Sequence, residues 1–359
     1  MSEKFRLDKG GLINRDKKLS FKFNGKKYFG YEGDTLASAL IANGVHLVGR
    51  SFKYHRPRGF FGAGVDEPYA IVQMNRNNEV DPNVRATEQE LFEGLEAKSV
   101  NCWPNVDFDI GAINNFLGKF FPAGFYYKTF MWPKSFWYKI YEPIIRKAAG
   151  FGAASIKHDK EKYEHKYEYC DLLITGSGPS GLASAYAAAQ NGAKVILAED
   201  KSRFGGSLLT SEVTIGNQSG QEWAEKIISE LKSMPNVVVK NRSQVFGYYD
   251  HNMLVMSERV SDHLPKTDKY IPKQRLWYIR AKEVVISSGS IERPLVFGNN
   301  DAPGVMLSSA AKEYLKIYGV LVGKKPIIFT NNDSGYETAI EFKKNGVDPI
   351  VLDTRKDPN

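Results

Sequence analysis

A glycine-rich turn offers the clearest chemistry in the chain. Gly176-Ser177-Gly178-Pro179-Ser180-Gly181 follows the short apolar run 171–175 and precedes an alanine-rich stretch that ends at Asn191-Gly192. Strand, turn and helix in this order place unpaired backbone N–H groups at a helix start, where they can bind a pyrophosphate. Glycine permits the tight turn, the close approach to phosphate and the close packing of helix on sheet. The candidate contacts are Gly176, Gly178, Pro179, Ser180 and Gly181.

An acidic residue stands where a dinucleotide site needs one. Glu199 lies 23 residues after Gly176 and closes the second expected strand, 194–200. A carboxylate there accepts hydrogen bonds from ribose hydroxyls, and Asp200 is the second choice for this role. An acid at this place favours FAD or NAD over NADP. We therefore predict a dinucleotide site, against the alternative of a glycine turn with an empty groove.

Later segments add further candidate contacts. A second glycine pair follows the acid in the run 203–208, and four expected strands follow at 237–239, 243–249, 253–260 and 275–279. A buried strand at 284–286 then ends in small residues, which suits a chain that passes against a cofactor at the carboxyl edge of a sheet. These segments add Gly206, Ser207, Val245, Ser288 and Gly289 to the candidate cofactor-binding residues.

Other catalytic chemistry has little support. The chain has two cysteines, Cys102 and Cys170, which excludes a disulfide framework, a four-cysteine zinc site and a four-cysteine iron–sulfur cluster within it. Cys170 opens a buried strand and is expected to be an inert core thiol. The six histidines lack ligand spacing, and we identify no catalytic residue and no metal ligand.

Composition indicates a folded protein of two or three domains. The chain has 359 residues, 42% of them hydrophobic, and a net charge of +8. The positive charge suits anionic cofactors, a partner with acidic faces or weak nucleic-acid adhesion, and does not choose among them. No apolar run reaches the length of a membrane span and the N-terminus has no secretory signal, so we expect a cytoplasmic protein.

Expected elements divide the chain into four parts. Residues 1–100 show hairpin, helix, loop and strand, the order of a β-grasp module, with Asn24-Gly25 as the hairpin turn and Asp34 or Thr35 as the helix cap. Residues 101–168 form an aromatic-rich arm and linker, 169–320 a dinucleotide-binding domain, and 321–359 a second, degenerate nucleotide-binding unit. The predicted class is α/β: a cluster-free β-grasp module followed by a two-dinucleotide-binding flavoprotein-type Rossmann domain, truncated in its second unit.

The arm is marked by aromatic side chains. Twelve of the 26 residues from Phe116 to Tyr141 are aromatic, with lysines interleaved and no acid before Glu142. Prolines make one continuous helix unfavourable. We expect an extended arm that packs on its own core or on a neighbouring subunit. A membrane-surface patch is the weaker alternative, because it needs a sustained amphipathic helix.

The last segment repeats the strand–helix–strand pattern without the glycine spacing. A strand at 325–330, a helix at 334–344 and a strand at 348–352 are expected, with the turn Thr330-Asn331-Asn332-Asp333-Ser334-Gly335 between the first two. A doubly wound sheet needs more strands than these. We expect a chain that is truncated or completed by further polypeptide.

These motifs together resemble the N-terminal part of the large (α) subunit of heterotetrameric sarcosine oxidase. The resemblance covers essentially the whole chain, whereas the family's α subunit continues into a folate-binding region. The matching segments are residues 49–59, 175–181, 288–297, 300–307 and 330–334.

The resemblance implies a multi-subunit oxidase. Such an assembly oxidises sarcosine to glycine, produces peroxide, and delivers the one-carbon unit as formaldehyde or to tetrahydrofolate. It implies FAD and the chemistry on a β subunit, FMN between α and β, and smaller γ and δ subunits. It also implies non-catalytic NAD in this chain, lined by Gly176, Gly178, Gly181, Glu199 and Gly206. Ser287-Ser288-Gly289 departs from the Ala-Thr-Gly that relatives often have.

Two alternatives stay open. The chain could be the α subunit of an opine or proline oxidase with FAD at the glycine turn, or a nucleotide-binding scaffold without chemistry of its own. The N-terminal module also resembles the [2Fe–2S] domains of related oxidases, but its loop carries a basic run, 50–58, in place of cysteines. We expect this run to pair with carboxylates; a cofactor phosphate is the second option and nucleic acid the third.

Overall fold

A computed structural model describes residues 3–76, 79–120, 130, 132–150, 152, 154–265, 268 and 270–356. It divides into two compact units. One unit contains Met1–Asp159 and Glu292–Asn359, and the other contains Lys160–Ile291. Within the described ranges, every helix is too short or too polar to span a bilayer.

The N-terminal module has the strand order expected of a β-grasp fold. Its five-stranded sheet runs β2-β1-β7-β5-β6, with β1 and β7 parallel. Asn24 and Gly25 both have positive φ, 50° and 77°, so the predicted hairpin turn is confirmed. Thr35 caps the helix in a capping box with Ser38. The elements are β1 (Asn14–Phe23), β2 (Lys26–Glu32), α1 (Leu36–Ala42), β3 (Gly49–Arg50), β4 (Pro57–Arg58), β5 (Ile71–Arg76), β6 (Glu79–Arg85) and β7 (Leu95–Ser99).

The C-terminal residues belong to the same unit as this module. Tyr314 is buried and donates a hydrogen bond to Gly62 O at 2.9 Å, and Leu307 N donates to Phe61 O at 2.9 Å. The grouping thus joins residues 292–320 to the N-terminal module, whereas the sequence analysis assigned them to the dinucleotide-binding domain, 169–320. The helix expected at 334–344 is confirmed. This segment contains α7 (Ser308–Tyr318), β16 (Ile327–Thr330), α8 (Ser334–Lys344) and β17 (Ile350–Asp353).

The aromatic-rich arm consists of short helical pieces. The described pieces are η1 (Ile110–Ala112), α2 (Ile113–Phe116), η2 (Leu117–Phe120), η3 (Lys134–Phe136), the π-helical η4 (Trp137–Tyr141) and α4 (Glu142–Ala149). Pro133 directly precedes η3, as expected of a helix breaker, whereas Pro143 lies in the first turn of α4 and residues 134–149 are helical without a break. The aromatic residues Phe121, Phe125, Tyr126 and Tyr127 lie outside the described residues.

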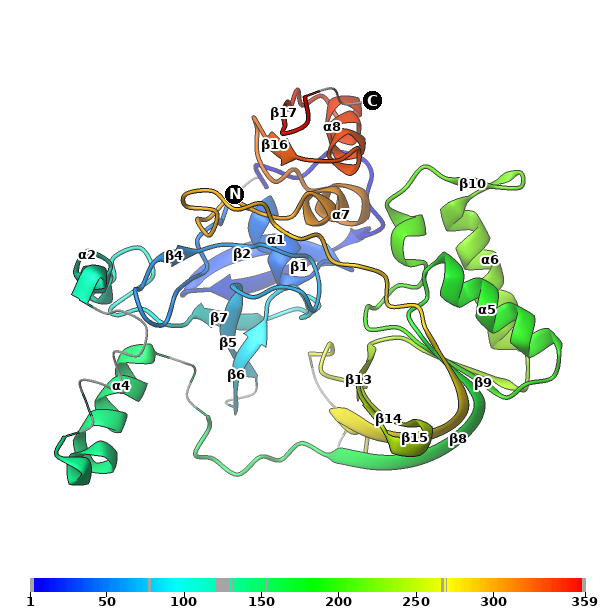
Figure 1. Ribbon diagram of the computed structural model, residues 1–359, viewed down its shortest axis with the longest axis horizontal. Coiled ribbons are helices and arrows are strands. Elements are labelled where there is room, and N and C mark those ends of the chain that lie inside the picture. The colour runs from blue at the N-terminus through cyan, green and yellow to red at the C-terminus, as the bar shows by residue number, and fades with distance from the viewer. Residues whose placement is uncertain are drawn as a thin grey trace. The chain divides into compact units, whose positions relative to one another are not determined.

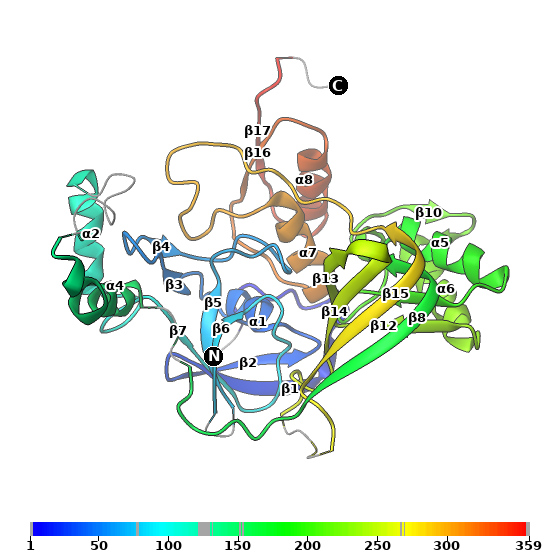
Figure 2. The ribbon, with the colours of Figure 1, turned by 60° about the horizontal axis from the view of Figure 1, so that its bottom comes forward.

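The second unit is a Rossmann-type layer structure. Its six-stranded sheet runs β12-β9-β8-β15-β14-β13; the first four strands are parallel, and β14 is antiparallel to both of its neighbours, β15 and β13 (Figures 1 and 2). The elements are β8 (Tyr163–Thr175), α5 (Pro179–Gln190), β9 (Val195–Ala198), η5 (Gly206–Leu209), β10 (Thr214–Ile215), β11 (Gln218–Ser219), α6 (Gly220–Ser233), β12 (Val237–Lys240), β13 (Ser243–Tyr249), η6 (Asp250–Asn252), β14 (Met253–Arg259) and β15 (Gln274–Ile286).

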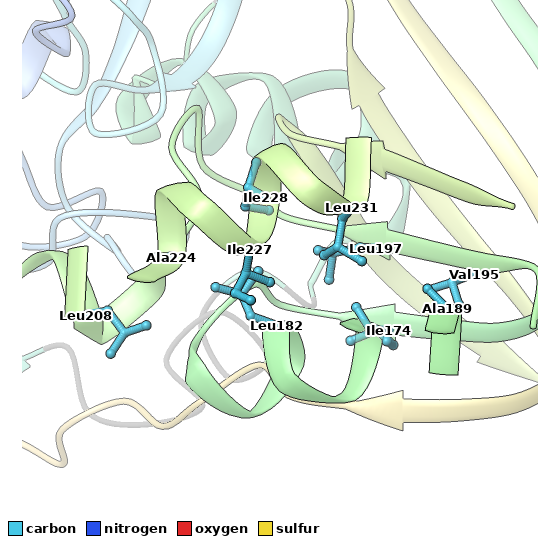
Figure 3. Packing of buried hydrophobic residues seen from close by; sticks show 11 residues of the cluster. Ile174, Leu182, Ala189, Val195, Leu197, Leu208, Ala224, Ile227, Ile228 and Leu231 are labelled. Atoms are coloured by element: carbon cyan, nitrogen blue, oxygen red, sulfur yellow. The ribbon is translucent and has the colours of Figure 1, made fainter. Parts of the chain in front are cut away.

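Two apolar layers hold this sheet. On one face α5 and α6 bury Leu182, Ile227 and Leu231 against Ile174 and Leu197 (Figure 3). On the other face the meander of β13, β14 and β15 covers a second cluster that includes Cys170. Burial raises the pKa of the Cys170 thiol to about 12, in agreement with the inert core thiol predicted. Close packing on both faces fixes the end of β8, from which the glycine turn leaves.

The linker prediction was wrong over residues 163–169. These residues form the first half of β8, which pairs in parallel with β15 from Tyr163 onward. Likewise 275–279 and 284–286 are parts of one strand, β15, and not two strands. Tyrosines alternate with charged residues in this half, and Tyr167 stacks on Tyr278 with ring centroids 5.1 Å apart. The charged residues in this segment obscured the two-residue alternation that identifies a strand in a sequence.

Candidate nucleotide site

The turn between β8 and α5 requires glycine at two places. Gly176 has φ 96°, and a Cβ there would lie 2.4 Å from Ser287 O. A Cβ at Gly181 would lie 2.0 Å from Gly176 O. Neither distance is tolerable for a side chain, so both residues do what the motif predicts: one makes the turn and the other lets α5 lie on the sheet.

Gly178 differs from these two because its surroundings are open. A Cβ at Gly178 would meet no atom within 4 Å. The residue is the N-cap of α5, and no side chain caps this helix. Pro179 and Ser180, in the first turn of the helix, are exposed. Space and uncapped N–H groups therefore occur together at the N-terminus of a 12-residue helix, which is the arrangement that binds phosphate.

The second glycine pair lies beside the same turn. A Cβ at Gly206 would lie 2.9 Å from Gly178 Cα, and Gly206 itself has φ 53°. Gly205 N donates to Ser177 Oγ at 3.1 Å. Ser207 follows in η5 and is exposed. The structure thus brings Gly206 and Ser207 to the glycine turn, although about 25 residues of chain separate them from it.

Glu199 is at the expected place but its carboxylate is already engaged. Oε2 accepts hydrogen bonds from Ser177 N at 2.9 Å and Ser177 Oγ at 2.5 Å, and Oε1 accepts from Lys201 N at 3.1 Å. Burial and the neighbouring Asp200 carboxyl raise the pKa of Glu199 to about 7, although the Ser177 hydrogen bonds oppose this shift. Through its hydrogen bonds to Ser177, Glu199 therefore also holds the glycine turn in place.

Ser177 is a site residue that our sequence reasoning missed. The residue between the first two glycines is treated as variable by the motif, so its type carried no signal. Here it is fully buried and joins the turn both to the strand-end acid and to the second glycine pair. The only sequence feature that could have indicated this role is the small hydroxyl side chain within a turn expected to be buried.

Ser288, Gly289 and Val245 occupy different surroundings. Ser287 N donates to Thr175 O at 2.8 Å, so the exposed Ser288 and Gly289 follow directly beside the glycine turn. Val245 lies on β13, whose first residue, Ser243, donates its N–H to Glu199 O at 2.7 Å. Its half-buried side chain packs against the cluster under the meander. Ser288 and Gly289 join the turn, whereas Val245 supports the sheet near the acid.

The basic run 50–58 is bound within its own unit. Arg56 Nη2 lies 2.7 Å and Arg58 Nη1 lies 2.5 Å from the carboxylate of Asp301. Hydrogen bonds from Arg56, together with the charge and hydrogen bond of Arg58, lower the pKa of Asp301 to about 2. The expected pairing with carboxylates is therefore confirmed for these two arginines.

The loop that follows α1 does not fit an iron–sulfur cluster. It contains no cysteine, and across the described part of the chain no group of three or more His, Cys, Asp or Glu side chains could hold a metal. The loop is instead organised by the buried Glu67 carboxylate. Its oxygens accept four backbone N–H bonds of 2.6–2.9 Å, from Phe61, Gly62, Tyr69 and Ala70.

Two protein-family models match parts of the chain. Residues 16–102 match a 2Fe-2S iron-sulfur cluster binding domain, and residues 171–251 match FAD dependent oxidoreductase. The first match agrees with the β-grasp order but meets a loop without thiolate ligands. The second spans the glycine turn, Glu199 and the second glycine pair.

Comparison with curated proteins finds the alpha subunit of sarcosine oxidase. The chain is 52% identical over 352 residues to that subunit of Rhizobium meliloti, covering 98% of this chain and 36% of the relative. It is 31% identical to that of a Corynebacterium species, covering 97% of this chain and 32% of the relative. One of the opine oxidase subunits of Agrobacterium tumefaciens is 25% identical over 53% of the chain and 38% of its own length. The chain thus spans about a third of the length of these relatives.

A solved structure shares the fold. L-proline dehydrogenase from P. horikoshii superposes with a TM-score of 0.63 at 20% identity, covering all of this chain and 57% of the other. At this identity the likeness shows the architecture alone. It supports the mixed α/β class in which a β-grasp module accompanies a dinucleotide-binding domain.

Proposed function

Because the chain is homologous to the alpha subunit of sarcosine oxidase over 98% of its length, we propose that it is the nucleotide-binding subunit of a sarcosine oxidase-like oxidoreductase. The observation that carries the nucleotide part is the open space at Gly178 in front of the uncapped N-terminus of α5. The homology carries the reaction class.

The proposed assembly oxidises the C–N bond of a secondary amine. Sarcosine gives up two electrons and two protons, which reduce oxygen to hydrogen peroxide. The oxidised methyl carbon then leaves glycine by reaction with water, as formaldehyde, or with tetrahydrofolate, as 5,10-methylenetetrahydrofolate. The reaction takes place at a flavin on a β subunit, with FMN between the two chains and with γ and δ subunits completing a cytoplasmic heterotetramer. This chain contributes no catalytic residue in the proposal.

Bound here, NAD would be a structural ligand and not a hydride carrier. The first-turn N–H groups of α5 and the turn at Gly178 would face its pyrophosphate. Gly206 and Ser207 would close the turn from the other side. Glu199 would accept from the adenine ribose while Ser177 holds its other oxygen.

FAD at the same turn is the second candidate. The match of residues 171–251 to FAD dependent oxidoreductase favours it, as does the similarity to the opine oxidase of Agrobacterium tumefaciens. In that case the chain would carry a flavin that accepts two electrons from substrate. A nucleotide-free scaffold is the third reading, and the open space at Gly178 argues against it.

An iron–sulfur cluster is not part of the proposal. The two cysteines of the chain supply half of the four thiolates that such a cluster needs, and Cys170 is buried in the core of the other unit. The Glu67 side chain accepts hydrogen bonds from four backbone N–H groups of this loop.

The test is to purify the complete chain with its co-expressed partner subunits, denature it, and identify the released nucleotide by mass spectrometry. Release of NAD together with sarcosine-dependent peroxide formation supports the proposal. FAD from this chain, with activity on an opine or on proline, supports the second candidate. Release of no adenine nucleotide beyond that of the partner subunits expressed without this chain overturns both.

A further inference from the structure

The described parts of 102–149, residues 102–120, 130 and 132–149, belong to a segment whose two ends lie close together. Asn101 N donates to Gly150 O at 2.9 Å, and a Cβ at Gly150 would lie 2.8 Å from Asn101 Cα. Gly150 has φ 64° and ends α4. The two ends of this segment, called here the arm loop, are therefore held together at its base. A long segment whose two ends are held together loses less conformational entropy on binding than a free tail does.

The first part of the arm loop is fastened to the basic run. Arg50 donates to Val106 O from Nε at 3.0 Å and from Nη2 at 2.8 Å. The buried pair His55 and Asp109 is 2.6 Å apart, between Nδ1 and Oδ2. A Cβ at Gly111 would lie 2.3 Å from His55 Nδ1, so the backbone at Gly111 packs directly against the His55 imidazole. The run 50–58 thus positions the arm loop as well as Asp301.

Beyond this base the arm loop exposes large apolar side chains. Phe116 and Trp132 are 83% exposed and Tyr138 is 82% exposed, and Phe120 and Ile144 are exposed as well. Single exposed apolar residues are common on protein surfaces. A concentration of aromatic ones on one segment marks an interaction site, and Trp and Tyr are the types that dominate interface energies.

The charge of the arm loop indicates what kind of partner fits. Residues 113–149 contain six lysines or arginines and one acid, Glu142. Arg146 Nε already pairs with Glu142 at 2.8 Å, which leaves the lysines as the net charge of the surface. Aromatic side chains with interleaved lysines suit an apolar surface rimmed by carboxylates.

We propose that the arm loop docks on an acidic face of another subunit of the same enzyme. The proposal rests on the proposed function, because that function places the chain in a multi-subunit assembly. A bilayer suits the arm loop poorly, because residues 134–149 pass from a 3₁₀ helix (η3) through a π-helix (η4) to an α-helix (α4), so their apolar side chains do not follow a single helical period.

The experiment compares co-purification of the partner subunits with three forms of the complete tagged chain. The first variant combines Phe116→Ser with Tyr138→Ser, and the second combines Lys139→Glu with Lys147→Glu. Val296→Ser is the control, since Val296 is 93% exposed in the same unit but outside the arm loop. Subunit stoichiometry and the dissociation constant are measured by analytical ultracentrifugation at low and high salt. Retained nucleotide and circular dichroism report whether the fold is intact.

We expect both arm-loop variants to weaken association at least tenfold while the control leaves it unchanged. The charge-reversed variant should also lose the salt dependence of the wild-type association. Retained nucleotide should not change, so this result is separate from the nucleotide assignment. Equal stoichiometry and affinity in all forms overturns the proposal.

Three further outcomes also overturn it. One is arm-dependent flotation of the chain with phosphatidylglycerol vesicles, which would assign the surface to a membrane. Another is a concentration-dependent homodimer that Phe116→Ser dissolves. The third is full hydrogen-exchange protection of 113–120 and 134–147 in the complete chain alone, which would show that its own polypeptide covers the loop.

Discussion

Gly178 and Glu199 have opposite roles at the candidate site. Gly178 leaves an open space in front of the helix, and its substitution meets no neighbouring atom. Glu199 fills the space under the turn, where it is buried and hydrogen-bonded to Ser177. In the proposed site, Gly178 would leave room for the pyrophosphate, and Glu199 would fix the shape of the turn that receives it.

At Gly178 we expect Gly178→Val to abolish nucleotide retention without unfolding the protein. The valine side chain would extend into the open space where the pyrophosphate is proposed to lie. The measurement is nucleotide released on denaturation, with circular dichroism as the fold check. Gly298→Ala is the matched control, since a Cβ there also meets no atom within 4 Å and lies in the other unit. Normal nucleotide content in Gly178→Val would refute the site.

At Glu199 we expect a pH-dependent contribution to stability. The folded-state pKa of about 7 lies above the ordinary value of 4.5, so the folded protein keeps a proton there that the unfolded chain has released. The free energy of unfolding of the wild type, relative to Glu199→Gln, should therefore fall as pH rises from about 4.5 to about 7. Its slope should be up to about 1.4 kcal/mol per pH unit.

Urea unfolding at pH 5, 6, 7 and 8 measures this difference. The exposed Glu283→Gln on β15 serves as the control and should show a flat difference. A flat difference for Glu199→Gln as well would contradict the buried, protonated carboxyl. In a separate binding measurement at pH 8, where Glu199 is ionised, Glu199→Ala should weaken NAD binding by about 1–3 kcal/mol, the typical effect of losing a charged hydrogen-bond partner.

At the scale of elements, local patterns predicted most of the helices and strands. The hairpin at Asn24-Gly25, α8 and the β8–α5–β9 order have strong local signals: positive-φ turn residues, a bounded amphipathic segment and a glycine motif between apolar runs. The first half of β8 had no such signal, because its alternating tyrosines and charges are stabilised by pairing with β15, more than a hundred residues away. Ser177 was missed because its hydrogen-bond partners, Glu199 and Gly205, are also distant from it in the sequence.

Residues 292–307, called here the strap, allow a test of whether the Asp301 ion pairs hold this segment in place. Asp301 pairs with both Arg56 and Arg58, and its pKa is lowered to about 2 from 3.8. Asp301→Asn should increase hydrogen exchange across 299–304 and cost about 1 kcal/mol at pH 7, a small value because the pairs are partly exposed to solvent. Asp8→Asn, an exposed acid of the same unit, is the control.

The pH dependence of this effect has a definite sign. Since the folded-state pKa of Asp301 is depressed, the contribution is present above about pH 4 and is lost as pH falls toward 2. The wild type and Asp301→Asn should therefore converge in stability in acid. A difference that persists at pH 2, or exchange that is equal at pH 7, would show that the ion pairs do not hold the strap.

At the scale of the whole molecule, sequence reasoning identified the relatives and the two kinds of module. The mixed α/β class is confirmed, as is the homology to the alpha subunit of sarcosine oxidase. The association of 292–359 with the N-terminal module was beyond reach, because it depends on contacts such as Tyr314 with Gly62 that no local pattern encodes. The identity of the nucleotide stays a prediction, since an acid at the ribose position suits NAD and FAD alike.

The most direct measurement is an experimental density map of the complete assembly, purified without added nucleotide. The account predicts an adenine dinucleotide whose pyrophosphate lies within hydrogen-bond distance of the backbone at Gly178 and the first turn of α5, with Glu199 near a ribose. A turn without nucleotide density, or one filled by a side chain from any chain of the assembly, would contradict it.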